Sequence, residues 1–216
     1  MKNLTIRLET EKDYRPVENL TREAFWNTYV PGCDEHYLVH TMRTHKDFIP
    51  ELAFVLELDG EMIGNIMYTK AKLVDENKNE KQILTFGPVS ILPKYQRQGY
   101  GKMLIEYSFE KAITLGYDTI VIFGNPSNYV SRDFKSCSKH NICLEGNVFK
   151  SSMLVKELTE GALDGRRWFF YESSAGEACA DDDAVASFDA TFPTKEKAWK
   201  PSQEEFYINS HSTIVR

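Results

Sequence analysis

Three features are missing from this sequence: a long apolar run, an excess of basic residues and a paired-cysteine motif. No stretch approaches the roughly 20 consecutive apolar residues that a membrane-spanning helix needs, so we expect no membrane segment. The first residues, MKNLTIRLETEKDY, carry a charge every few positions and hold no apolar core of a signal peptide. We therefore expect a cytoplasmic protein.

The cysteines offer neither a metal site nor a clear disulfide framework. Cys33, Cys137, Cys143 and Cys179 form no CxxC pair and have no zinc-type spacing with a histidine. An even number of cysteines is compatible with disulfides, but a chain of this size without a signal sequence favours reduced thiols. His36 and His40 are spaced as a metal pair, but the glutamate of an HExxH motif is absent. We expect no metal.

The charge and size of the chain narrow the possible classes further. The formal net charge is −6 at pH 7, whereas a nucleic-acid-binding protein usually presents a basic face, so we expect no nucleic-acid partner. This charge does not exclude a local basic pocket, and Lys94, Arg97 and Lys102 cluster in one short stretch. A chain of 216 residues that is 42% hydrophobic forms one domain, or one domain with a modest appendage.

The most informative stretch is ILTFGPVSILPKYQRQGYGKM, residues 83–103. An apolar run ends at Pro93, passes through a turn that contains Gly99 and Gly101, and leads directly into a helix-like sequence. Glycines let a main chain approach a ligand closely, and the free amides at a helix start favour negative charge. This order predicts a phosphate-binding turn. On the glycines alone, a tight turn without a ligand is the alternative.

The sequence excludes two common classes of phosphate-binding turn. No GxxxxGK[ST] motif occurs, which removes a Walker P-loop. The dinucleotide fingerprint GxGxxG also fails, because Leu104 stands where the third glycine belongs.

Hydrophobic periodicity predicts an alternation of strands and helices. We expect strands at residues 4–8, 53–58, 61–72, 83–92, 119–123 and 148–157, and helices at 11–29, 34–43, 99–115 and 129–134. Asp59-Gly60 predicts a hairpin turn, and Gly116 predicts a helix end. Because residues 119–123 are wholly apolar, we expect a buried parallel strand and a βαβ-type unit over residues 83–123.

The character of the chain changes at Gly161. The stretch that follows is acidic and punctuated by proline, yet it holds too many aromatic residues for ordinary disorder. We therefore predict a domain over residues 1–160 and an appendage over residues 161–216 that packs on it. A disordered tail is the alternative.

Residues 89–105 resemble a known signature. Gln96-x-x-Gly99-x-Gly101, preceded by Val89 to Tyr95 and followed by Lys102 to Ile105, is similar to the acetyl-CoA signature of the GNAT N-acetyltransferase superfamily. The order of predicted elements from residue 4 to about residue 157 also fits this family. The subgroup that the chain resembles most consists of predicted acetyltransferases with a long C-terminal extension. The resemblance implies a GNAT fold of the α/β (α+β) class, in which a mixed central β-sheet is flanked by helices.

The resemblance also implies a donor site for acetyl-CoA as cosubstrate. Main-chain groups of Val89, Ser90 and Ile91 would bind the pantetheine amides in a gap where the signature strand splays from the next strand. Backbone amides of the turn would hold the pyrophosphate, with contributions from Arg97, Gln98, Gly99, Tyr100, Gly101 and Lys102. In family members, a tyrosine that precedes a phenylalanine by five positions often protonates the leaving thiolate. Tyr129 and Phe134 match this pattern, although Asp133 replaces the usual glycine.

The acceptor half of the reaction is less clear from the sequence. Asn125 either binds the pantetheine chain, as the resemblance implies, or serves only its turn. No general base stands out, although the polar residues of the second helix border the acceptor site in the family: Asp34, Glu35, His36 and His40. We expect an N-acetyltransferase that moves an acetyl group directly to a primary amine, as a monomer or homodimer. The alternative is a non-catalytic acyl-CoA-binding sensor or partner protein.

Overall fold

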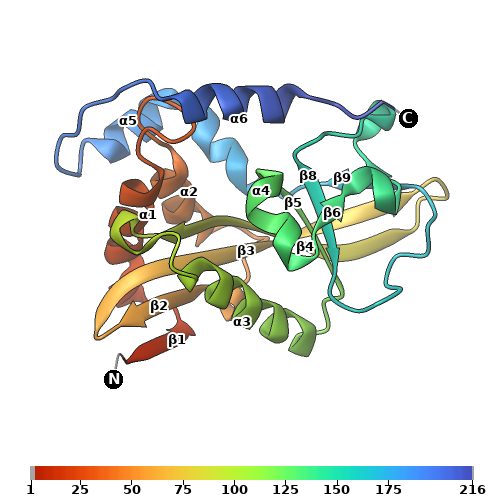
Figure 1. Ribbon diagram of the computed structural model, residues 1–216, viewed down its shortest axis with the longest axis horizontal. Coiled ribbons are helices and arrows are strands. Elements are labelled where there is room, and N and C mark those ends of the chain that lie inside the picture. The colour runs from red at the N-terminus through yellow and green to blue at the C-terminus, as the bar shows by residue number, and fades with distance from the viewer. Residues whose placement is uncertain (1–2, 216) are drawn as a thin grey trace.

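The computed structural model describes residues 3–215, so the predicted domain limits at residues 1 and 216 lie outside this range (Figure 1). The strands are β1 (Leu4–Leu8), β2 (Phe54–Leu58), β3 (Glu61–Asp75), β4 (Glu80–Ile91), β5 (Thr119–Phe123), β6 (Lys135–Ser136), β7 (Ile142–Cys143), β8 (Met153–Glu157) and β9 (Trp168–Tyr171). The α-helices are α1 (Tyr14–Phe25), α2 (Glu35–Met42), α3 (Tyr100–Thr114), α4 (Pro126–Tyr129), α5 (Asp182–Asp189) and α6 (Pro201–His211).

One mixed sheet runs through the molecule in the order β1-β2-β3-β4-β5-β8-β6. Neighbouring strands in this order are antiparallel except that β5 runs parallel to β4, as expected for a βαβ-type unit. The long strand β3 pairs with β2 near its start and with β9 at its end, and β7 joins β9 in parallel. The predicted mixed α/β fold and the hairpin between β2 and β3 are confirmed.

The two faces of the sheet are covered by different helices because side chains alternate along each strand. Ile66 and Tyr68 of β3 pack with Leu104 of α3 in one apolar cluster. Met67, between them, packs with Val17 of α1 and with α2 in a separate cluster. The strand alternation therefore puts α3 on one face and the pair α1 and α2 on the other.

Tertiary contacts moved two predicted boundaries, and a third differs by one residue at each end. The helix expected over residues 11–29 ends at Phe25, because Trp26 and Asn27 leave the helical conformation and donate side-chain hydrogen bonds to the Glu196 carbonyl at 2.8 and 3.1 Å. The strand expected over 148–157 begins only at Met153, since the Ser151 amide bonds the Ser212 carbonyl at 3.1 Å instead of a strand. The helix expected over 99–115 spans Tyr100–Thr114.

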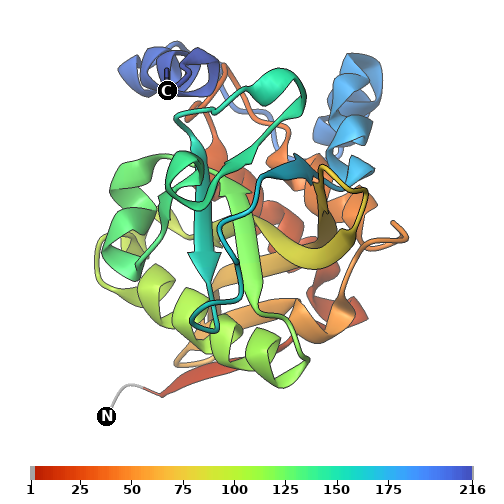
Figure 2. The same cartoon turned by 90° about the vertical axis from the view of Figure 1, so that its right-hand side faces the viewer.

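The C-terminal segment returns to the body of the protein. Trp168 and Phe170 of β9 are 6% and 3% exposed, in an apolar cluster that includes Leu73 and Ile83. Figure 2 shows α5 and α6 at the end of the molecule opposite β1. The Arg22 side chain of α1, 2% exposed, forms an ion pair with Asp189 of α5 at 2.6 Å. These contacts tie residues 161–215 to both the sheet and α1.

No helix formed by residues 3–215 has the length and apolar character needed to cross a membrane. No disulfide forms within this range.

Candidate active site

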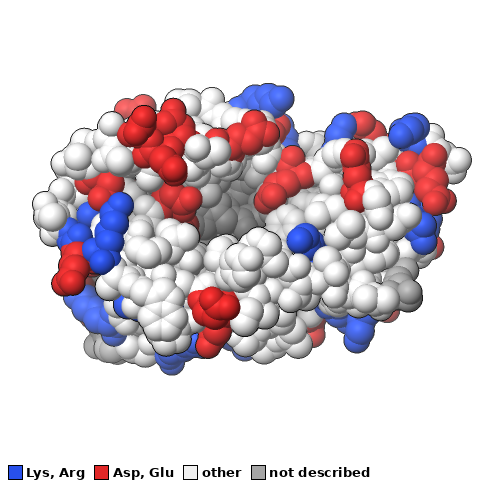
Figure 3. Space-filling view, turned by 90° about the horizontal axis from the view of Figure 1, so that it is seen from above, with Lys and Arg blue, Asp and Glu red and all other residues white. Residues whose placement is uncertain are grey.

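The strands β4 and β5 diverge soon after they meet. Their pairing is limited to Leu84 and Ile120, although β4 continues to Ile91. A cavity of about 1060 Å³ lies along the unpaired part of β4 and is lined there by Val89 and Ile91. Seen from the side of α5 and α6, the surface is hollowed, with Asp and Glu side chains around the hollow (Figure 3). The divergence thus leaves room for a ligand beside the sheet.

One end of the cavity is the glycine turn before α3. Arg97 and Gly99 both adopt a positive φ, 60° and 90°, and Gly99 is the N-cap of α3. The side chains of Gln96 and Gln98 donate to the carbonyls of Ile91 and Lys94, both at 2.9 Å, and fix the turn.

The amides of residues 97–102 have no backbone acceptor within the described chain, residues 3–215. A helix start with free amides favours an anion, and the basic residues Arg97 and Lys102 line the same end. The chemistry of this turn therefore fits a phosphate group.

The two glycines of the turn have different requirements. No atom lies within 4 Å of a Cβ built on Gly99, so its φ of 90° is what demands glycine. A Cβ on Gly101 would touch Ile91 Cγ1 at 3.5 Å, an ordinary contact, and Gly101 lines the cavity. A larger side chain at Gly101 would therefore extend into the cavity without straining the backbone.

Tyr129, at the end of α4, lines the middle of the cavity. Its ring packs against Phe86 of β4 and Phe134, with centroids 5.8 and 5.6 Å away. Gly124 leaves the space for this ring, since a Cβ there would lie 2.6 Å from Tyr129 Cε2. Burial raises the pKa of the Tyr129 phenol above its ordinary value, and Tyr29 adds to this effect. The phenol therefore stays protonated and can act as a proton donor.

Four other predicted residues turn their side chains elsewhere. The Ser90 hydroxyl donates to Thr21 of α1 at 3.3 Å, Gln98 folds onto its own turn, and Tyr100 packs on Tyr95. The Asn125 side chain accepts a hydrogen bond from the Ser127 amide at 3.0 Å and caps α4, which is turn chemistry. The roles expected of Ser90, Gln98 and Tyr100 used main-chain groups and stay predictions, as does the pantetheine role of Asn125.

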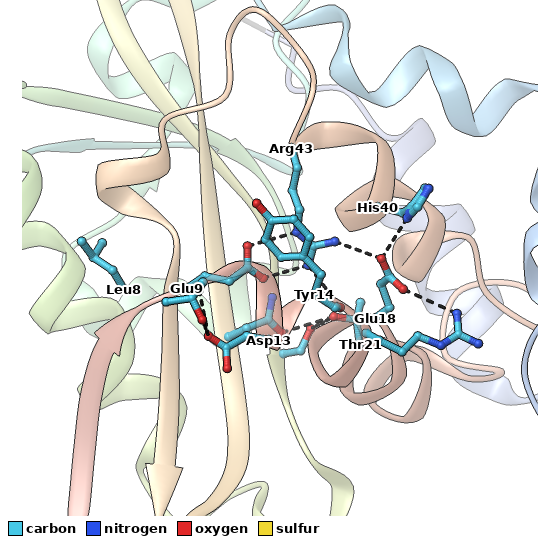
Figure 4. Close-up of polar contacts among 12 residues, drawn as sticks. Leu8, Glu9, Asp13, Tyr14, Glu18, Thr21, His40 and Arg43 are labelled. Carbon is cyan, nitrogen blue, oxygen red and sulfur yellow. Dashed lines mark hydrogen bonds and ion pairs between the residues drawn. The ribbon is translucent and has the colours of Figure 1, made fainter.

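The other end of the cavity is formed by α1, α2 and the segment 172–177, which follows β9. A buried ionic network fixes α2 against α1 and the end of β1 (Figure 4). Arg43, just after α2, donates to Glu9 at 2.8 and 3.0 Å and to Glu18 of α1 at 3.0 Å. His40 also contacts Glu18 at 2.9 Å. This network holds the helices that form the wall of the cavity.

Two of the carboxyl groups that line this end have a raised pKa, and neither was assigned a role from the sequence. Glu35 opens α2, and burial, followed by the nearby Asp34, raises its pKa to about 8. Burial alone raises the pKa of Glu172. The sequence marked Glu35 only as one of several polar residues, and no local pattern marks Glu172, because β9 alone brings it to the cavity.

The histidines of α2 have structural surroundings. Burial lowers the pKa of His36 to about 4, and its Nε2 lies 3.1 Å from Asp189 Oδ1. His40 packs on Phe188 with ring centroids 4.5 Å apart. Within residues 3–215, no group of three His, Cys, Asp or Glu side chains is arranged to hold a metal ion.

Comparison with known proteins shows that the chain is similar to acetyltransferases. Residues 19–135 match the model of the acetyltransferase (GNAT) family. The chain is 26% identical over 163 residues to the uncharacterized N-acetyltransferase YhbS of Escherichia coli K12, covering 75% of this chain and 92% of the relative. It is 25% identical over 136 residues to the uncharacterized N-acetyltransferase YjhQ of the same strain, covering 63% and 72% of the two chains.

Solved structures share the fold. The structure of Escherichia coli YhbS in complex with CoA superposes with a TM-score of 0.70 at 22% identity, over 82% of this chain and 93% of that one. A GNAT family acetyltransferase from Brucella melitensis in complex with acetyl-CoA gives a TM-score of 0.62 at 22% identity, over 80% and 97%.

Proposed function

The chain belongs to the acetyltransferase (GNAT) family, and on that premise we propose that it transfers an acetyl group from acetyl-CoA directly to a primary amine. The observation that carries this proposal is the single cavity that joins the glycine turn, the unpaired part of β4 and Tyr129. Both cosubstrates would occupy it together, so that transfer needs no covalent intermediate on the protein.

The donor end has the groups that an acetyl-CoA site requires. The free amides of residues 97–102, with Arg97 and Lys102, would bind the pyrophosphate. The main chain of Val89 to Ile91, which has no strand partner on the side of β5, would bind the pantetheine amides. When bound, acetyl-CoA supplies an activated thioester.

Tyr129 is proposed as the general acid. Protonation of the sulfur as the C–S bond breaks assists departure of the thiol, and a phenol that remains protonated at neutral pH can supply that proton. The raised pKa of Tyr129 and its position between the two ends of the cavity support this role.

The donor site is tested by calorimetric titration of acetyl-CoA into the wild-type protein and Gly101→Glu. Added charge and bulk at residue 101 should abolish binding while the thermal unfolding temperature changes little. Met103→Glu is the matched control, because Met103 lies two positions further along α3 and is 44% exposed outside the cavity. Unchanged affinity in Gly101→Glu would remove the donor assignment.

Catalysis is tested separately by thiol release with a panel of primary amines. Turnover that Tyr129→Phe lowers much more than acetyl-CoA affinity supports the enzyme. Tight acetyl-CoA binding with no turnover on any amine would instead favour the non-catalytic sensor.

A further inference from the structure

The cavity has ends of opposite charge. Its basic side chains, Arg97, Lys102 and Arg132, lie at the glycine turn and beside α4. The opposite end is lined by the carboxyl groups of Glu35, Glu172 and Glu177, and no Lys or Arg of residues 3–215 lines it with them. A long cavity of this kind suits an anion at one end and a cation at the other.

These three carboxyl groups have no cation of their own. Elsewhere in the protein, buried carboxylates are paired: Glu9 and Glu18 with Arg43, and Asp75 with Arg166. Among the described residues 3–215, no Lys, Arg or His side chain forms an ion pair with Glu35, Glu172 or Glu177. Desolvation of a carboxylate without a counterion is unfavourable, so a cation from outside would bind here well.

Glu172 lacks a compensating charge within residues 3–215. Its pKa is raised by burial alone, with no charge or hydrogen bond acting on it. Its side chain is nevertheless accessible, and it lines the cavity. The Glu172 carboxylate is therefore accessible from the cavity although protein atoms surround it.

The wall that carries Glu172 is fixed to the loop after α2. The Ser173 hydroxyl donates to Asp47 Oδ2 at 2.9 Å. The Asp47 amide donates to His45 Nδ1 at 3.2 Å, so His45 Nε2 carries the hydrogen that faces the Ser174 hydroxyl at 3.1 Å. These hydrogen bonds fix the backbone next to Glu172, so the position of its carboxylate is preorganised for a ligand.

Glu35 lines the same cavity as Tyr29 and Tyr129. Burial raises the pKa of Tyr29 and the charge of Glu35 adds to this effect, while Tyr29 in turn adds to the raised pKa of Tyr129. Tyr29 is held in place by the rings of Phe25 and Phe206, with centroids 5.7 and 4.6 Å away. An amine bound beside Glu35 would therefore lie in the same cavity as Tyr129.

We propose, building on the acetyltransferase function above, that the acceptor is an amine carrying a second positive charge, that Glu172 binds this second charge, and that Glu35 accepts a proton from the reacting ammonium group. Glu172 is then a specificity residue, and Glu35 is the general base.

The proposed step balances in atoms and charge. Glu35 removes one proton from the ammonium group, and the freed lone pair forms an N–C bond to the thioester carbonyl carbon. The C–S bond breaks, its electron pair stays on sulfur, and Tyr129 gives that sulfur a proton. The nitrogen loses a second proton as the amide forms. Of the two protons lost, one is balanced by the S–H bond and the other passes to solvent.

The test compares 1,4-diaminobutane with butylamine, which has the same carbon chain and one ammonium group. For the wild type, we expect kcat/KM for the diamine to exceed that for butylamine by roughly 10- to 100-fold, the effect of one charge-assisted contact. Glu172→Gln should remove this preference by lowering kcat/KM for the diamine to a value near that for butylamine. Glu110→Gln, an exposed change of the same charge on α3, should keep the preference.

A binding measurement separates this inference from the proposed function. Each amine is titrated calorimetrically into the CoA-saturated protein and into the Glu172→Gln variant. Selective diamine binding that depends on Glu172, without thiol release for any amine, supports the cation site and overturns the transferase. Equal turnover and equal binding of the two amines supports the transferase and overturns the cation site.

Discussion

Gly124 and Tyr129 occupy adjoining space: a Cβ atom on the glycine would lie 2.6 Å from Cε2 of the tyrosine ring. No real side chain tolerates that distance, and the ring has little freedom to retreat, because Phe86 and Phe134 pack against it. The position of the proposed acid thus depends on the absence of a side chain five residues earlier. Gly124 therefore serves to position Tyr129 and not to bind a ligand.

Gly124→Ala should therefore lower turnover by displacing Tyr129. We expect a loss of about 10²-fold in kcat, the lower range for removal of a general acid, with a destabilisation of roughly 1–3 kcal/mol from overpacking. Steady-state thiol release and thermal unfolding measure the two effects. In a Tyr129→Phe background the alanine should cost almost no further activity. A full additional loss there would show that Gly124 acts by another route.

Activity should rise with pH through about 8, the pKa of Glu35. Below that pH the carboxyl group is protonated and cannot accept the proton of the amine, so kcat/KM should fall about tenfold per unit. The groups that face Glu35 are Asp34, Cys33, Tyr29 and Cys179. Burial keeps both thiols and the phenol neutral in this range, whereas burial also raises the pKa of Asp34, so Glu35 and Asp34 titrate as a coupled pair of carboxyl groups.

A pH profile of kcat/KM for the wild type and Glu35→Gln checks this assignment. The variant should lack the rise near pH 8 and keep only the later rise that the ionisation of the amine itself produces. If the wild type and Glu35→Gln showed the same rise in kcat/KM near pH 8, that rise would belong to another group.

The carboxyl group of Glu35 should also make the ligand-free protein less stable as pH rises. Its pKa in the folded chain, about 8, lies above the value near 4.3 of an unfolded glutamate. The native state therefore binds more protons between these values, and the free energy of unfolding contributed by Glu35 falls across that window. At pH 9, Glu35→Gln should unfold at a higher temperature than the wild type, and at pH 4 the two should agree. A variant that is less stable at pH 9 would contradict the sign.

Asp189→Ala should destabilise the protein, because it leaves the charge of Arg22 buried without a partner. Removing one partner of a buried pair costs about 3–5 kcal/mol, and the 20% exposure of Asp189 suggests a value at or somewhat below the lower limit. Denaturant unfolding measures this change. Asp183→Ala, on the exposed side of the same helix, is the control and should stay within about 0.5 kcal/mol. If Asp189→Ala and Asp183→Ala lowered the free energy of unfolding equally, the ion pair between Arg22 and Asp189 would contribute no more to stability than an exposed aspartate does.

A chain ending at residue 160 should not fold stably, whereas one ending at residue 173 should. The longer chain retains β9, whose Trp168 and Phe170 complete the apolar cluster beside Leu73. Circular dichroism melts of the two truncated chains test the proposed division between a domain and an appendage. If the chain ending at residue 160 melts cooperatively near the full-length temperature, the appendage is separable from the core.

Local sequence sufficed for the sheet and the glycine turn, and it failed where the chain depends on distant partners. Asp59-Gly60, the alternating strand patterns and the apolar residues of β5 each encode their structure within a few positions. The end of α1 could not be read in this way, because Trp26 and Asn27 turn aside to bond a carbonyl about 170 residues later. Strand β9 was missed for the same reason, since its partner β3 lies almost a hundred residues earlier.

The sequence by itself determined the donor half of the site. Strand, turn and helix follow one another directly from Ile83 to Met103, so the main-chain geometry of the turn is set by its own glycines and capping side chains. Only the tertiary structure decided the proposed acceptor half. Glu35 and Glu172 come from two distant parts of the chain, and the charge and depth of their end of the cavity exist only after the sheet and helices have packed. Desolvation of a carboxyl group is a property of everything around it, and no local pattern encodes it.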